Sequence, residues 1–122
     1  EIPAAEKPQL FSTYFTGLFR SMRFGTESAH GRGAKLQYGY LKQKGAFAWD
    51  EARQRYTVDY DRMEAGIRDL LNAQLMLQAT GDYAGTKAFF DRYAMLDDAA
   101  NSRFAAMADI PVDIAPVYPD EV

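Results

Sequence analysis

His30 is the only histidine of this 122-residue chain, and histidine is the side chain best suited to proton and hydrogen-bond chemistry near neutral pH. It lies in the run ESAHGRGA at residues 27–34. Gly25 ends the preceding apolar segment and Thr26 is a suitable N-cap, so we expect a helix with His30 about one turn from its start. Because a helix N-terminus disfavours a charged imidazole, this ring could donate a hydrogen bond to a ligand or a developing oxyanion.

The residues around His30 are unusually small. On a helix the histidine shares a face with the following residues: Gly33, Ala34, Gln37 and Leu41. In one interpretation, the small residues let a neighbouring helix pack tightly, and His30 is a buried polar residue that bonds a backbone carbonyl. In the other, they let a ligand approach the imidazole closely. The pattern alone leaves both interpretations open.

Five segments in order resemble a known family: FRSMRFG, ESAHGRG, LKQKGAF, LQATGDYAGTKAFFDRYAML and DIPVDIAPVYP. Together they are similar to the C-terminal part of the zinc metallopeptidases of the dipeptidyl peptidase III family, most closely its bacterial branch. The resemblance implies that His30 binds a peptide substrate and stabilises the transition state beside a zinc ion. It also implies, more weakly, that the flanking Glu27 and Arg32 contact the substrate.

The zinc ligands of that family are missing from this sequence. The family motifs resemble His-Glu-x-x-x-His and a downstream Glu-Glu-x-(Arg or Lys)-Ala-(Glu or Asp), and neither occurs here. The resemblance therefore implies a fragment that holds no metal, is inactive alone and packs against the remainder of a catalytic lobe, which holds the zinc. The acidic pairs Asp97/Asp98 and Asp120/Glu121 lack partners at ligand spacing, so we interpret them as a helix cap and a solvated chain end.

Composition excludes several other classes of protein. A net charge of −3 with scattered basic residues argues against a nucleic-acid partner. The sequence has no long apolar run and no signal-peptide pattern, so we expect no membrane partner. It also has no cysteine, which fits a reducing compartment, and we expect a cytoplasmic protein. A hydrophobic content of 48% is ample for one globular domain.

The hydrophobic periodicity predicts a mainly α fold, with about five helices in an irregular bundle, one small β-hairpin and an extended C-terminal tail. We expect residues 1–8 to be an extended lead-in or linker and 9–122 to be a helical C-terminal subdomain of a larger catalytic lobe. The expected helices are residues 9–24, 26–44, 60–79, 83–93 and 98–108, and the expected strands are 46–49 and 55–58. In the tail, Ile110, Val112, Ile114 and Val117 would pack along a groove.

Three functional classes remain. The first is a segment of a dipeptidyl peptidase III-like hydrolase. The second is a non-enzymatic helical interaction module whose apolar faces form a partner groove. The third is a small-molecule-binding domain that uses His30, the glycines and a stacking Trp49, although Trp49 could instead cover the helix ends together with Phe47. A fragment would also expose apolar surface, so we expect the isolated chain to self-associate as a symmetric homodimer or to aggregate.

Overall fold

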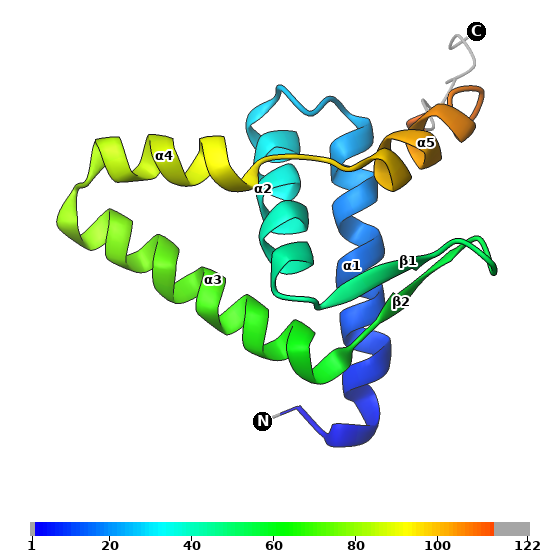
Figure 1. Cartoon of the computed structure of the whole chain (residues 1–122), viewed down its shortest axis with the longest axis horizontal. Helices are drawn as coiled ribbons and strands as arrows, with labels where there is room; N and C mark the ends of the chain where they lie inside the picture. The colour runs from blue at the N-terminus through cyan, green and yellow to red at the C-terminus, as the bar shows by residue number, and fades with distance from the viewer. Residues whose placement is uncertain (1, 114–122) are drawn as a thin grey trace, which may run out of the picture.

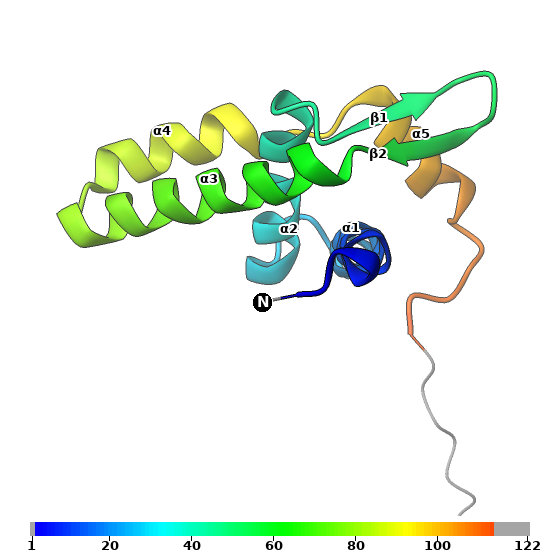
Figure 2. The same cartoon turned by 90° about the horizontal axis from the view of Figure 1, so that it is seen from below.

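The computed structural model describes residues 2–113 and shows a mainly helical fold. Its elements in chain order are a 3-10 helix η1 (Ala4–Glu6), α1 (Lys7–Arg23), α2 (Ala29–Gln43), β1 (Phe47–Asp50), β2 (Arg55–Val58), α3 (Tyr60–Thr80), α4 (Tyr83–Tyr93) and α5 (Asp98–Ala106). The predicted class, five helices with one hairpin, is confirmed. The antiparallel pair α1 and α2 forms the centre, α3 and α4 project to one side, and the hairpin and α5 lie on the other (Figures 1 and 2). No helix within residues 2–113 is both long and apolar enough to span a membrane.

The start of the chain is more helical than the sequence pattern predicts. We expected an extended lead-in up to Pro8, but η1 occupies residues 4–6 and α1 already begins at Lys7. Pro8 lies in the first turn of α1, where its fixed φ suits a helix and its missing N–H would have no partner in any case. Pro3, the N-cap of η1, and Pro8 therefore lie at the starts of helices and do not prevent them.

The turn between α1 and α2 also differs from the prediction. The N-cap of α2 is Ser28, whose side chain accepts a hydrogen bond from the Gly31 N–H at 3.2 Å, and not Thr26. Gly25 has φ of 115°, which favours glycine and ends α1 as expected. Since α2 starts at Ala29, His30 is its second residue, closer to the helix N-terminus than the predicted full turn.

The core lies where α1 crosses α2 and the hairpin. Most of its buried residues come from α1 and α2, and the others come from the hairpin region, α3 and α5: Phe11, Phe15, Leu18, Met22, Ala34, Tyr38, Leu41, Ala46, Phe47, Met63 and Ala100. The Phe47 ring lies 4.5 Å from Phe15 and 4.9 Å from Tyr38, measured between centroids. The hairpin therefore covers the two central helices, as predicted, and this packing stabilises a two-stranded sheet that would be marginal alone.

Two glycines of α2 allow backbone to pass directly over the helix. A Cβ atom at Gly39 would lie 1.9 Å from the Tyr93 carbonyl oxygen, because the connection from α4 to α5 crosses α2 there (Figure 1). A Cβ atom at Gly31 would lie 1.9 Å from the Gly25 carbonyl oxygen. Real Cβ atoms do not approach oxygen so closely, so these two positions require glycine. Part of the small-residue pattern therefore serves chain crossing and not ligand approach.

Helices α3 and α4 are joined by a short turn, and a capping residue lies on each side of it. Gly81 adopts φ of 63° and ends α3, and the Asp82 side chain accepts a hydrogen bond from the Gly85 N–H at 2.8 Å to start α4. The predicted apolar stripe of α3 is only partly covered. Met63 and Leu70 are buried, whereas Leu71 and Leu75, nearer the turn, are exposed. Near the turn α3 projects away from the central pair α1 and α2, so this half of the helix lies away from the core (Figure 1).

After α5 the chain turns back along α1. The Arg23 guanidinium donates a hydrogen bond to the Ile110 carbonyl, and Ile110 and Val112 line a hollow against the end of α1 and against α5. Residues 109–113 are non-helical, in agreement with the expected tail. Ile114 and Val117, which we expected to continue this packing, lie outside the described residues.

Candidate functional site

His30 is on the surface. Its side chain is exposed, and among residues 2–113 it makes no hydrogen bond, ion pair or ring contact. The alternative of a buried histidine bonded to a carbonyl is therefore wrong. Gly33 lies one turn further along α2, and a Cβ atom there would meet nothing within 4 Å. The surface next to the imidazole is open to a partner.

Glu27 and Arg32 lie together in a hollow of about 390 Å³ between the start of α2 and the end of α4. Its other lining residues are Lys35, Phe90, Asp91 and Ala94. The Glu27 carboxylate lies 3.9 Å from the Lys35 ammonium, and the Arg32 guanidinium carbon is 5.6 Å from the centre of the Phe90 ring. His30 does not line this hollow, so the structure brings together two of the three predicted site residues.

This hollow can bind polar backbone or carboxylate groups. The Phe90 ring orients the Arg32 guanidinium, which has no ion pair with a carboxylate among the described residues. A guanidinium oriented in this way can offer parallel N–H donors to a carboxylate or a carbonyl. Asp91 pairs with Lys87 at 2.7 Å, whereas Glu27 lies 3.9 Å from Lys35, so Glu27 is the more loosely paired acceptor of the hollow. Donors and acceptors in one open hollow suit a peptide better than an anion alone.

The described residues do not form a metal site. Within residues 2–113 no group of three or more His, Cys, Asp or Glu side chains is arranged to hold a metal ion. Structural and catalytic zinc sites use at least three protein ligands. The residues present therefore do not fit zinc.

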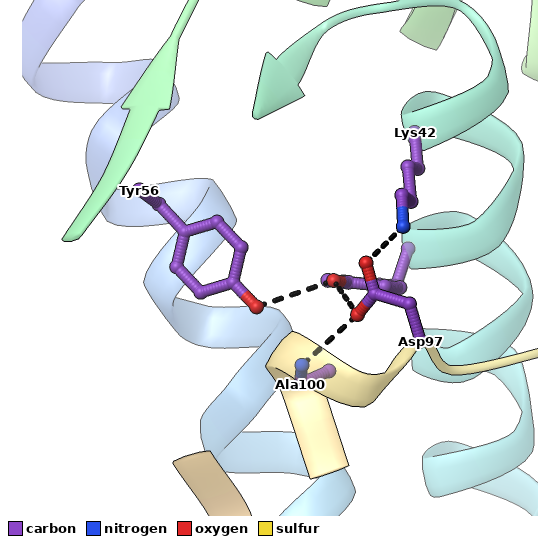
Figure 3. A network of polar contacts seen from close by, with 5 residues as sticks. Lys42, Tyr56, Asp97 and Ala100 are labelled. Carbon is purple, nitrogen blue, oxygen red and sulfur yellow. Dashed lines mark hydrogen bonds and ion pairs between the residues drawn. The ribbon is translucent and has the colours of Figure 1, made fainter. Parts of the chain in front are cut away.

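A second polar cluster, which the sequence did not predict, centres on Asp97, the N-cap of α5 (Figure 3). One carboxylate oxygen accepts hydrogen bonds from the Tyr38 hydroxyl at 2.8 Å and the Ala100 N–H at 2.9 Å. The other oxygen accepts from the Lys42 ammonium. The Tyr38 and Tyr56 hydroxyls lie 3.2 Å apart. The cluster joins α2, β2 and α5, and each of its side chains bonds another member of the cluster, so we assign it to stability.

Burial and hydrogen bonding shift the pKa of Asp97 in opposite directions and the pKa of Tyr38 in the same direction. Partial burial tends to raise the pKa of Asp97, but the hydrogen bonds from Lys42, Ala100 and Tyr38 together favour the carboxylate and bring the pKa below its usual value. Burial, and to a lesser degree the hydrogen bonds to Tyr56 and Asp97, raise the pKa of Tyr38 far above the ordinary tyrosine range. Near neutral pH, Asp97 is therefore charged and Tyr38 is a neutral donor.

Replacing Asp97 by alanine should lower the free energy of unfolding by about 2 kcal/mol at neutral pH. The substitution removes the N-cap of α5 and the acceptor of the buried Tyr38 hydroxyl. Since the folded pKa of Asp97 is lowered, its stabilisation is present above the unfolded pKa and is lost as the pH falls through the folded value. Urea unfolding at several pH values measures both effects. Asp97→Asn, which keeps the cap, is the control. Wild-type stability in Asp97→Ala would contradict this assignment.

Trp49 is part of the scaffold. Its indole N–H donates to the Glu51 carboxylate at 2.6 Å, and the Arg103 guanidinium carbon lies 4.8 Å from the ring centre. The Tyr56 ring packs edge-on at 5.0 Å. The ring is half-buried among these neighbours, and this favours the interpretation that Trp49 covers the helices over the one in which it stacks on a ligand.

Comparisons with known proteins give longer relatives. The structure of DPP III from Caldithrix abyssi matches 95% of this chain with a TM-score of 0.87 and 36% identity, and dipeptidyl-peptidase III from Corallococcus sp. strain EGB matches 95% with a TM-score of 0.85 and 28% identity. The match covers 22% and 21% of those chains. A plant protein, Nudix hydrolase 3 of Arabidopsis thaliana, is 31% identical over 112 residues, which are 90% of this chain and 14% of that protein. No family model matches the sequence.

Proposed function

Because this chain is similar in sequence and fold to one segment of bacterial dipeptidyl peptidase III, as its sequence motifs indicated, we propose that it is a substrate-binding segment of a longer zinc dipeptidyl peptidase. The observation that carries this proposal is the agreement in fold and sequence with two bacterial enzymes over nearly the whole chain. Since the match covers only about a fifth of their length, the activity is proposed for the complete polypeptide that contains this chain.

In this proposal His30 donates a hydrogen bond to the carbonyl of the scissile peptide bond. A neutral imidazole N–H at that oxygen would stabilise the negative charge that develops in the transition state. Three observations support the role: His30 is the second residue of α2, its side chain is exposed, and no partner within residues 2–113 occupies the ring. His30 would thus be available to a substrate held between this segment and the remainder of the protein.

Glu27 and Arg32 would hold the peptide on the neighbouring surface. Arg32 can donate to a backbone carbonyl or a carboxylate of the substrate, and Glu27 can accept from a backbone N–H or an amino terminus. The hollow that they line supports this assignment, because it is open and carries both donors and acceptors. These two residues would orient the peptide, whereas His30 would act on the reacting carbonyl.

The zinc ion of the proposed enzyme must be held by residues outside positions 2–113, because those positions offer no metal-binding group. We propose a cytoplasmic location for the complete protein, since this 122-residue segment has no cysteine and so suits a reducing compartment. The plant relative bears the name of another hydrolase class. Because this chain corresponds to only 14% of that relative, the name does not assign its activity to this segment.

The proposal predicts a clear division of activity between the complete polypeptide and the 122-residue chain. We expect the complete protein to contain stoichiometric zinc and to release dipeptides from the amino terminus of test peptides. We expect the 122-residue chain to do neither, because its described residues supply no zinc ligands. Metal analysis after purification, together with mass spectrometry of the peptide products, measures both properties.

A chelator provides the control for this comparison. Removal of zinc from the complete protein should abolish dipeptide release, and added zinc should restore it. A complete protein that releases no dipeptide, or a 122-residue chain that holds zinc and cleaves peptides alone, would overturn the proposal.

A further inference from the structure

We propose that the projecting ends of α3 and α4 form the surface against which the rest of the longer polypeptide packs. This inference rests on the proposed function, because it takes the chain to be one segment of a larger enzyme. We call this surface the α3–α4 tip and define it by four side chains: Leu71, Leu75, Met76 and Tyr83. Figure 1 shows that this end of the two helices projects away from the central pair α1 and α2.

The α3–α4 tip exposes a large amount of apolar surface. The exposed fractions of Leu71, Leu75, Met76 and Tyr83 are 53%, 50%, 63% and 83%. Leu71, Leu75 and Met76 lie on the last turns of α3 and Tyr83 on the first turn of α4, so the four residues are close to one another along the chain. Helix α4 has no buried residue at all. Clustered exposed apolar side chains of this kind mark an interaction surface more often than an ordinary monomer surface.

The α3 part of the tip carries no charge, which distinguishes it from the first half of α3, and Asp82 at the turn is the charged residue next to it. Five charged residues lie between positions 61 and 69: Asp61, Arg62, Glu64, Arg68 and Asp69. From Leu70 to Gly81 the sequence LLNAQLMLQATG carries none. Centres of protein interfaces are depleted of charged residues, whereas a solvated helix face normally carries them. The change occurs within one helix, next to Leu70, which is the last buried residue of α3.

The length of the related enzymes indicates what covers the α3–α4 tip. This fold makes up about a fifth of each bacterial relative, so the remaining chain must pack somewhere on it. The complementary surface should be apolar and nearly uncharged. It should also carry hydrogen-bonding groups for the exposed amides of Asn72, Gln74 and Gln78. A second copy of this chain is the competing occupant, and the experiment distinguishes the two.

The test is Leu75→Asp in the complete polypeptide, with Leu10→Asp as the matched control, since Leu10 on α1 is similarly exposed at 42%. A charge at a buried interface is costly. We therefore expect Leu75→Asp to lower the Tm of the complete protein and to remove the hydrogen-exchange protection of residues 71–79. Leu10→Asp should change neither quantity. Neither measurement depends on peptidase activity, so a failure of the proposed function would not be mistaken for a failure of this inference.

Three results would overturn the inference. The first is an unchanged Tm with unchanged exchange in Leu75→Asp of the complete protein. The second is an equal effect of Leu75→Asp and Leu10→Asp, which would show that any added charge is disruptive. The third combines two findings. The 122-residue chain sediments as a dimer that Leu75→Asp makes monomeric, and the same substitution has no effect on the complete protein. That result would assign the tip to a second copy.

Discussion

Replacing His30 by alanine in the complete polypeptide should lower kcat by about 10²–10³-fold, the usual effect of losing one oxyanion donor. The Tm of the protein should stay unchanged, because the side chain is exposed and makes no contact within residues 2–113 that the substitution would remove. The zinc content should also stay unchanged, since His30 belongs to no metal-binding group among the described residues. The combination of a large kinetic effect with no stability effect identifies a residue that acts on the substrate.

His30→Gln is the informative companion variant. Its side-chain amide can still donate a hydrogen bond, although from a different distance, so we expect part of the lost kcat to return. Arg32→Ala should mainly raise KM, because Arg32 is proposed to hold the peptide away from the reacting carbonyl. Wild-type turnover in His30→Ala would discard the catalytic role. A large fall in Tm with a proportionate loss of activity would show a structural role instead.

Elements that depend on local sequence could be predicted well. The spacing of apolar residues predicted the five helices and the hairpin. The N-caps Asp59 and Asp82 bond N–H groups only three positions away, so capping too is a local signal. The prediction of Thr26 as the N-cap of α2 was wrong, since Ser28, two positions later, is equally suitable by residue type. The Ser28 side chain accepts a hydrogen bond from the Gly31 N–H. The Gly25 carbonyl lies directly over Gly31, and only the folded turn reveals this contact.

The environment of the site depended on contacts distant in sequence. Arg32 packs on Phe90 from a different helix, and no local pattern indicates such a pair. Asp97 was identified as a cap, but its bonds to Tyr38 and Lys42 join residues 59 and 55 positions apart. The exposure of His30 was undecidable because small neighbours suit both a helix crossing and a ligand. In the fold, Gly31 and Gly39 serve crossings, while Gly33 faces open space.

The periodicity of α3 shows a related limit. An apolar stripe predicts that a helix face will be covered, but it does not say by what. The first half of the stripe is covered by this chain through Met63 and Leu70, and the second half is exposed at Leu71 and Leu75. The same pattern therefore describes both the core of this segment and the proposed contact with the rest of the polypeptide. Only the three-dimensional arrangement separates the two.

Two identical substitutions in α2 should change stability in opposite directions. Gly39→Ala should lower the free energy of unfolding by about 3 kcal/mol, because the new methyl group would collide with the Tyr93 carbonyl and overpacking costs about this much. Gly33→Ala should raise it by up to about 1 kcal/mol, since alanine is the better helix former and nothing lies within 4 Å of the added atom. Urea unfolding followed by circular dichroism measures both changes.

The pair tests the chain crossing and not helix propensity, because each variant makes the same replacement in the interior of the same helix. Propensity alone predicts that both alanines stabilise the protein. A Gly39→Ala variant as stable as Gly33→Ala would mean that the connection between α4 and α5 does not pass over Gly39. That connection leads to Asp97, whose bonds fix the far end of α2, so Gly39→Ala should also weaken the anchoring of the helix that presents His30.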